Sequence, residues 1–472
     1  MTNLSHLHHR LTRRDLLRYG GSSITAAALT SLLAQDSVAA PADPLAPKQP
    51  HFPPRAKSVI YLFSSGGVSQ LDLFDPKPTL IKQNGKPVPE DLVAGQRFAF
   101  ISGRPNLMAS PYTFEKYGES GCELSNLLPH LATVADEATV VRSLQTSHVN
   151  HGPAQLLLWT GFERAGRPSL GAWSVYGLGS VNRDLPAYVV LSAGNERVTA
   201  DRFSSGFLPS VYQGVRFRSK GDPVLFLSDS AGVKREERRD VIDTITALDR
   251  ELLADVGDPE IATRIAQYEM AFKMQASVPE LVDLSNESAA TLEEYGVEPG
   301  VPSLAASLLQ ARRLVERGVR FVSIFDSGWD HHERIFHELP RSCANLDRPL
   351  AALVRDLKQR GLLDETLVVW TGEFGRTPML QGPADPTKSG RDHHKEAFVA
   401  WLAGGGVKRG LTLGATDEFG FKAVEDPVHI HDLNATILHL LGFDHEKLTY
   451  RSQGRDFRLT DVHGSVVKKL LS

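Results

Sequence analysis

The feature that most constrains the fold of this chain is an alternation of short, β-rich apolar runs with longer segments whose apolar residues recur at helical spacing. Such alternation is typical of α/β proteins, in which helices cover both faces of a mainly parallel sheet. The expected strands are residues 58–63, 139–142, 187–191, 320–325, 366–371 and 397–402. The expected helices are residues 124–135, 153–159, 235–255, 259–276, 303–317, 346–360 and 432–441.

Length and composition favour one large domain. The chain has 472 residues, of which 41% are hydrophobic and 23% are charged, and no linker divides the part that follows the N-terminal region. We therefore expect a single domain over residues 57–472, with a largely helical insertion or cap at about residues 211–297. The formal net charge of -4 gives no broad basic surface, so nucleic acid is not an expected partner.

The first forty residues have the pattern of a twin-arginine export signal. Arg13 and Arg14 precede a soft apolar run at residues 24–33, and the small residues 38–40 (VAA) resemble a cleavage site. We predict a signal peptide that ends at residue 40, a proline-rich lead-in over 41–56, and export by the Tat translocase to the periplasm or the extracellular space. No other stretch reaches the roughly 20 apolar residues that cross a bilayer, so no membrane span is expected after cleavage.

Two cysteines are too few for a disulfide framework or a thiolate zinc site. Cys122 and Cys343 either form one disulfide or are two buried thiols, and both alternatives stay open. A metal site in this chain must therefore be built from histidine and carboxylate ligands.

Ligands in open α/β sheets bind beyond the carboxyl ends of the strands, so side chains that follow the expected strands are the first candidates. The strand at 320–325 runs into a turn that holds two carboxylates and two imidazoles, Asp326, Asp330, His331 and His332. Oxygen donors beside imidazole nitrogens suit zinc, manganese, iron or magnesium. The turn is therefore predicted to bind a metal ion, with a solvated polar turn as the alternative.

Two further clusters lie beside expected strands. The strand at 366–371 leads into Glu373 and Arg376 in a glycine-rich loop, where the arginine could hold an oxyanion or pair with the glutamate. The adjacent imidazoles of His393 and His394 precede the last expected strand. Together these side chains extend the set of candidate ligands.

A fourth cluster, residues 146–153, follows a strand and opens a helix. Asn150 or His151 lies near the expected helix start, where backbone N–H groups and the helix dipole attract a phosphate or a sulfate. Plain capping by Asn150 is the alternative. His429 and His431, before the last expected helix, are interpreted as structural.

Taken in this order, the motifs resemble the alkaline-phosphatase and sulfatase superfamily. The resemblance is carried by the first strand, the helix that ends at Thr160 and Gly161, the Asp/His turn, the turn at 371–373 and the His394 segment. More closely, the chain is identified as a member of the exported bacterial family known as domain of unknown function 1501. The motifs behind this are GGVSQLDLFDPK (66–77), Asn150-His151, GWDHH (328–332), GEFGRTP (372–378) and GRDFRLT (454–460).

The resemblance implies an alkaline-phosphatase-like α/β fold and one or two divalent ions, whether zinc, manganese, calcium, magnesium or iron. The implied metal ligands are Asp326 with His331 or His332, then Glu373, then His393 or His394, with Asp330 and Asp72 as further acidic candidates.

The chain also departs from the superfamily pattern. The position of the usual Ser, Thr or Cys nucleophile is occupied by His151, and the Asp-His pair of the third turn is replaced by Glu373 and Phe374. The carboxylate expected after the first strand falls at Ser64 or Ser65. One metal site is therefore lost or rebuilt.

These residues predict an exported, metal-dependent hydrolase of sulfate or phosphate esters, on small molecules or polysaccharides, without the usual nucleophile. The candidate attacking groups are a water activated by the metal, Ser147 and His151. Arg376 and the helix start at Asn150 are expected to steady the oxyanion. The alternative is a catalytically inactive module of the cell envelope that binds a metal or a sulfated glycan.

Overall fold

A computed structural model describes residues 43–193, 198–219, 221–224, 232–385 and 387–472 of the chain. The chain divides into two compact units, Met1–Pro44 and Leu45–Ser472, and all the elements described here belong to the second. The expected signal peptide, residues 1–40, lies outside the described residues. Within the described part, no helix is both long and apolar enough to cross a membrane.

A nine-stranded sheet forms the centre of the described unit, with the order β12-β4-β11-β8-β1-β7-β5-β6 and with β15 also paired to β4. Neighbouring strands are parallel, except that β11 runs antiparallel to both β8 and β4. The mainly parallel α/β sheet is therefore confirmed, and all six expected strands belong to it. The strands are β1 (Ser58–Ser64), β4 (Ala138–Gln145), β5 (Tyr188–Ser192), β6 (Val215–Arg216), β7 (Phe321–Asp326), β8 (Thr366–Thr371), β11 (Phe398–Ala403), β12 (Leu411–Leu413) and β15 (Val428–His429).

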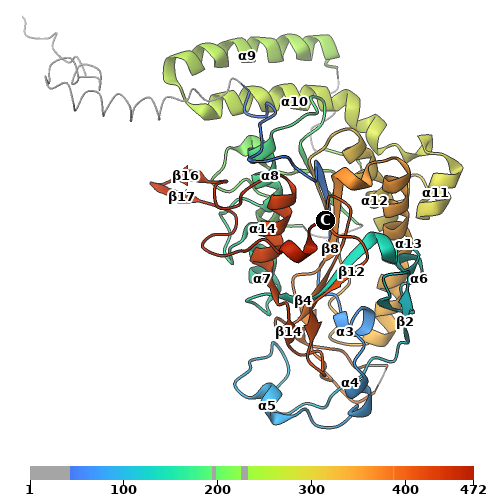
Figure 1. Ribbon diagram of the computed structural model, residues 1–472. Helices are drawn as coiled ribbons and strands as arrows, with labels where there is room; N and C mark the ends of the chain where they lie inside the picture. Colours follow the sequence, from blue (N-terminus) through green and yellow to red (C-terminus); the bar gives the residue numbers. More distant parts are fainter. Residues whose placement is uncertain (1–42, 194–197, 220, 225–231, 386) are drawn as a thin grey trace, which may run out of the picture. The chain divides into compact units, whose positions relative to one another are not determined.

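Helices cover both faces of this sheet (Figure 1). Alternate residues of a strand point to opposite faces, so Ile60 and Leu62 of β1 pack into one core with α12 (Leu304–Glu316) and α13 (Ile335–Gln359). The alternate residues Val59, Tyr61 and Phe63 point to the other face and pack into a second core with α7 (His151–Thr160), α8 (Leu170–Leu178) and α14 (Ile430–Leu440). Because β1 is buried on both faces, it consists of a nearly continuous apolar run rather than an alternating one.

The expected insertion at about residues 211–297 contains three helices, α9 (Arg235–Val256), α10 (Pro259–Val282) and α11 (Ala289–Tyr295). It also contains β6, which belongs to the main sheet, so the helical part begins only after that strand. The helices α9 and α10 pack against each other as a hairpin (Figure 1).

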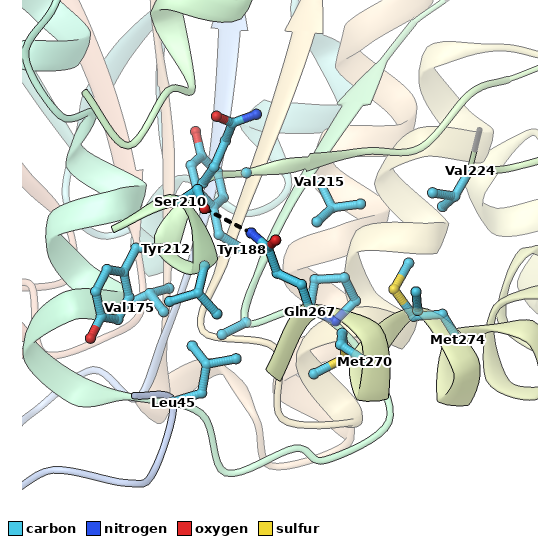
Figure 2. Close-up of a pocket in the computed structure, with 16 residues that line it drawn as sticks. Leu45, Val175, Tyr188, Ser210, Tyr212, Val215, Val224, Gln267, Met270 and Met274 are labelled. Atoms are coloured by element: carbon cyan, nitrogen blue, oxygen red, sulfur yellow. Dashed lines mark hydrogen bonds between the residues drawn. The ribbon is translucent and has the colours of Figure 1, made fainter. Parts of the chain in front are cut away.

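An apolar cavity of about 270 Å³ lies between α10 and the β5–β6 edge of the sheet (Figure 2). Its lining includes Met270, Met274 and Tyr188, and the amide of Gln267 donates to the hydroxyl of Ser210 at 2.9 Å. Tyr188 begins β5, whereas the candidate functional residues follow the ends of strands. The cavity is therefore at the other end of the sheet from the site described below.

The prediction of a helix at residues 124–135 is wrong. Cys122–Ser125 forms strand β3, which pairs with β2 (Phe114–Tyr117), and the chain becomes helical only for one turn, α6 (Pro129–Ala132). Leu124, Leu128 and Leu131 have helical spacing and all pack into the same core, but Leu124 lies in β3, Leu128 precedes α6 and only Leu131 is helical. Proline lacks the N–H that a continuing helix needs, which is why the helical turn begins at Pro129 rather than before it.

Cys122 and Cys343 lie in the same core and are both free and buried, so of the two alternatives left by the sequence the structure has two buried thiols rather than a disulfide.

Several short elements complete the described chain. The short helices are α3 (Gln70–Leu73), α4 (Pro78–Lys82) and α5 (Glu90–Val93), and the short strand pairs are β9 (Gly375–Arg376) with β10 (His393–His394), β13 (Ala415–Thr416) with β14 (Ala423–Glu425), and β16 (Tyr450–Ser452) with β17 (Arg455–Phe457).

The direction of β11 explains how the candidate clusters come together. The strands β1, β7 and β8 are parallel, so the loops that follow them lie at one edge of the sheet. Because β11 is antiparallel, the segment that precedes it, which contains β10, reaches the same edge. The candidate residues that follow β7 and β8 and those that precede β11 therefore lie at the same edge of the sheet.

Candidate metal centre

Four side chains form the one group among the described residues in which three or more potential metal ligands converge. They are His151 at the start of α7, Asp330 and His332 in the loop after β7, and His393 in β10. One ligand atom from each lies within 4.8 Å of all the others. Three segments far apart in the sequence therefore meet around one point, which we call the His3Asp group.

All three histidines of the His3Asp group are oriented in the same way. Each Nδ1 faces an oxygen acceptor outside the group and donates to it, so Nε2 is the nitrogen that carries a lone pair when the ring is neutral. The acceptors are Glu373 Oε1 at 2.6 Å for His151, Gln381 Oε1 at 2.7 Å for His332, and the carbonyl oxygen of Val149 at 2.7 Å for His393.

The three Nε2 atoms converge on the carboxylate of Asp330. The distances to its oxygens are 3.2 Å from His151, 3.0 Å from His332 and 3.0 Å from His393. The Nε2 atoms of His332 and His393 are only 2.8 Å apart. Lone pairs that face one another and an anion at this range need protons or a cation between them, so the donor set fits a bound metal ion.

The titration of these groups reflects the same crowding. Burial opposes a charge on His151, but hydrogen bonds to Asp330 and Glu373 raise its pKa to about 9. Burial also opposes ionisation of Asp330, but hydrogen bonds from the three histidines, together with the charge of Arg376, hold its pKa well below the usual range. Burial lowers the pKa of His393. The site therefore keeps Asp330 as an anion, the form that ligates metals.

Glu373 holds the ring of His151 from a fully buried position. Its carboxylate also accepts from the backbone N–H of Gly66, at 3.1 and 3.2 Å, and from the side-chain amide of Gln155 at 2.8 Å. Gly66 has φ +122°, and a Cβ there would lie 2.3 Å from the backbone nitrogen of Asp330. The glycine is thus required where the loops after β1 and β7 touch.

Arg376 is completely buried beneath the His3Asp group, and all three of its guanidinium nitrogens donate to protein acceptors. One nitrogen binds Asp330 Oδ1 at 2.6 Å together with the carbonyls of Gly66 and Trp329. The others donate to carbonyls of Gly67 and Arg391. Arg376 therefore holds the loops and Asp330 together, and its side chain has no exposed surface.

Phe374 closes the inner side of the His3Asp group. Its buried ring lies 4.3 Å from the ring of His393 and 5.1 Å from that of His151, measured between centroids. Phe374 occupies a position where the sequence resemblance led us to expect part of an Asp-His pair, and a phenyl ring cannot ligate a metal. Among the described residues, the His3Asp group is thus the one set of three or more potential ligands.

The remaining predicted ligands lie outside the His3Asp group. Asp326 accepts from the indole of Trp329 at 2.8 Å and lines a separate cavity of about 540 Å³, where burial raises its pKa to about 6. The ring of His331 is buried with no partner for Nε2, and burial, followed by the charge of Arg376, lowers its pKa to about 4. His394 binds the carbonyl of Phe421.

Asp72 is also separate from the group. Its fully buried carboxylate pairs with the buried guanidinium of Arg391 at 2.8 Å and accepts from Ser69 at 2.5 Å. This is a structural ion pair that ties the loop after β1 to the segment before β10.

The predicted residues near the start of α7 separate into two sets. His151 belongs to the His3Asp group, and Asn150 is the N-cap residue of α7 but makes no capping hydrogen bond with its side chain. The hydroxyl of Ser147 is exposed and lies 3.2 Å from Nε2 of His429. His429 in turn accepts from the backbone of His431 at the start of α14, which is the structural role expected for this pair.

Four residues that contact or support the His3Asp group were not among the predicted site residues: Gln155, Gln381, Asp392 and Phe100. Gln155 lies four residues after His151 on the same helix, so helical periodicity could have indicated it. Gln381 and Phe100 contact His332 from distant, irregular segments that carry no sequence signal. Asp392 adjoins a candidate ligand but serves the loop at Phe100 through backbone hydrogen bonds.

The fold and the site define a class of protein: a mixed α/β protein with a central, mostly parallel sheet and a potential metal centre at the carboxyl edge of that sheet. The chain belongs to the family described as "Protein of unknown function (DUF1501)", whose model matches residues 56–471. No curated protein sequence matches the chain.

Solved structures align with much of the chain at low identity. The PsFucS1 sulfatase from Pseudoalteromonas sp. is 13% identical, with 90% of this chain and 72% of that chain covered and a TM-score of 0.34. The lipoteichoic acid synthase LtaP from Listeria monocytogenes is 11% identical, with 87% and 76% covered and a TM-score of 0.34. The TAB5 alkaline phosphatase is 11% identical, with 83% and 98% covered and a TM-score of 0.31.

Proposed function

We propose that the protein is a metal-dependent hydrolase of sulfate or phosphate esters, in which the His3Asp group holds a single ion. One observation carries this proposal: three imidazole Nε2 atoms, each with its Nδ1 engaged elsewhere, point at the carboxylate of Asp330. Outer partners of this kind fix the tautomer and orientation of metal-binding histidines.

The ligand set bears on the choice of metal. Three imidazole nitrogens and one carboxylate suit a transition-metal ion such as zinc or iron, whereas calcium and magnesium prefer oxygen ligands throughout. When bound, such an ion would supply Lewis-acid stabilisation of the anionic ester oxygens. The side chains of Asp330 and His151 are 44% and 34% exposed, so the group is open to solvent on their side. That opening is where a substrate would approach.

The other residues position rather than react. Glu373 and Gln381 orient the rings of His151 and His332, and Arg376 holds the carboxylate of Asp330 from below. The first turn of α7 adds its backbone dipole on the side of His151, which favours an anionic ester group there. In the hydrolysis, water attacks sulfur or phosphorus, the bond to the ester oxygen breaks, and the alcohol leaves with a proton.

The test compares two carboxylates, one at the end of β7 and one in the loop that follows it. Asp330→Asn removes the anion at the centre of the group, whereas Asp326→Asn makes the same isosteric change four residues earlier and outside it. Elemental analysis of protein purified without chelator should find about one metal per chain in the wild type and in Asp326→Asn, and far less in Asp330→Asn. Hydrolysis of 4-nitrophenyl sulfate or phosphate should follow the same order. Metal loss in both variants or in neither would contradict the proposed site.

We further propose that the protein acts outside the cytoplasm, after export by the Tat translocase, on small-molecule or polysaccharide esters. The paired arginines, Arg13 and Arg14, and the residues that follow them support this. Replacing both arginines by lysine should leave the full-length precursor in the cytoplasm, as cell fractionation would reveal. Export that continues unchanged in this variant would refute the route.

A second candidate function is a non-catalytic module that binds a metal or a sulfated glycan. The observation that favours it is the use of His151, in place of a hydroxyl or thiol nucleophile, as a member of the ligand group itself. Stoichiometric metal without turnover of any sulfate or phosphate ester, together with binding of a sulfated polysaccharide, would favour this function over the hydrolase.

A further inference from the structure

Phe100 presents an exposed aromatic ring beside the His3Asp group. The residue is 64% exposed, yet its ring centroid lies 4.6 Å from that of His332 and 5.7 Å from that of His393, nearly perpendicular to both. Two of the four potential metal ligands are therefore in contact with a phenyl ring whose remaining surface faces solvent.

The loop that carries Phe100 is attached to the metal centre. The backbone N–H groups of Phe100 and Ile101 donate to one carboxylate oxygen of Asp392, at 2.8 and 2.9 Å. The other oxygen of Asp392 accepts from the backbone N–H of His393 at 2.8 Å. A single carboxylate thus fixes the position of the ring relative to a ligand of the group.

The residues around Phe100 hold the loop from the opposite side. Phe98 and Ile101 pack against a small separate core that includes Leu107 and Phe421, and the rings of Phe98 and Phe421 are 6.2 Å apart. These neighbours point into that core, whereas Phe100 points to the histidines. The backbone around Phe100 is therefore fixed by its neighbours, and the ring is exposed in that fixed conformation.

We propose that Phe100 forms a subsite that binds the alcohol part of the ester, and that this alcohol presents a flat apolar ring face, as aryl and pyranose rings do. The inference rests on the proposed function, because the ester group must sit at the His3Asp group for its alcohol to reach Phe100. An aromatic surface binds such ring faces through stacking and burial of apolar area. A methyl group offers little area to bury, so it adds little binding free energy.

The test measures selectivity between a ring-bearing and a ring-free ester. In Phe100→Ala, the ratio of KM for 4-nitrophenyl sulfate to KM for methyl sulfate should rise about tenfold, which corresponds to about 1.4 kcal/mol. Phe100→Tyr keeps the ring and should restore most of the ratio. Ile81→Ala removes a side chain of similar exposure, 61%, from α4 and is the matched control. An unchanged ratio in Phe100→Ala, or an equal change in the control, would overturn the subsite.

A binding measurement separates this inference from the proposed function. If the metal-loaded wild type hydrolyses no ester, the hydrolase proposal fails, but calorimetric titration with 4-nitrophenyl sulfate still tests the subsite. The inference predicts a dissociation constant about tenfold higher in Phe100→Ala, with metal content equal to that of the wild type. Equal affinity in the two proteins, or no binding by the wild type, would refute the subsite.

Discussion

The guanidinium of Arg376 donates to the carboxylate of Asp330 at 2.6 Å, although the arginine side chain is fully buried and the aspartate side chain is 44% exposed. The pair joins the interior of the protein to the partly exposed His3Asp group. Arg376 was expected to steady an oxyanion, but every nitrogen of its fork is already engaged by the chain. We therefore propose that it orients Asp330 and the loops after β1 and β7.

Arg376→Lys should harm both the fold and the metal site. Lysine keeps the charge, but its three N–H donors cannot serve the five acceptors that Arg376 engages, and each buried group left unsatisfied costs about 1–3 kcal/mol. Asp330 also loses its orienting partner, which should weaken metal affinity about 10-fold or more. Urea unfolding and metal titration check the two effects. A variant of unchanged stability that loses only turnover would contradict this role.

Asp72→Asn should destabilise the protein while leaving its metal in place. The change leaves the guanidinium of Arg391 buried without its anion, at a cost of about 3 kcal/mol or more in the free energy of unfolding. No ligand of the His3Asp group contacts Asp72, so metal content per folded chain should match the wild type. Denaturant unfolding paired with elemental analysis provides the measurement. Loss of metal without loss of stability would return Asp72 to the ligand set.

Acid should destabilise the protein through His431. Its ring stacks between those of His429 and His463, each 5.0 Å away, and burial, followed by these two neighbours, lowers its pKa to about 4. The unfolded state then takes up a proton near pH 6.5, before the folded state does, so the stability present above that pH is lost as the pH falls towards 4. His431 alone accounts for about 2 kcal/mol between pH 7.5 and pH 5.

The matched variant for this prediction is His431→Phe, which keeps a flat ring in the stack but cannot titrate. Urea unfolding at the two pH values should give a smaller loss for the variant than for the wild type, by roughly those 2 kcal/mol. Equal losses in both proteins would show that other groups carry the acid sensitivity.

Both cysteines should be unreactive in the folded protein. Cys122 and Cys343 are 6% and 0% exposed, and burial raises the pKa of each thiol, so little reactive thiolate forms at neutral pH. An Ellman-type thiol reagent should detect almost none in native protein and two per chain in denaturant. A denatured chain with no free thiol would instead indicate a disulfide.

The candidate site was predictable as a set of loops but not as a set of ligands. Asp330, His331 and His332 are consecutive, and the sequence allowed either histidine to ligate. In the structure His332 faces Asp330, while the ring of His331 is buried with no hydrogen-bond partner for Nε2. The same holds for His393, which joins the group, and His394, which binds the carbonyl of Phe421. In each pair the two histidines point to different surroundings, and only the tertiary structure decides which of them faces the site.

The sequence by itself determined the sheet and its covering helices, because strands such as β1 and helices such as α12 are recorded in the local spacing of their apolar residues. It also placed most of the candidate ligands in segments beside strands. Only the tertiary structure decided that β11 runs antiparallel, which brings His393 to the edge where His151 and Asp330 lie. Strand direction and side-chain convergence depend on contacts between residues far apart in the sequence, such as Ala400 with Thr371 and His393 with Asp330, and the local spacing of residues does not encode such contacts.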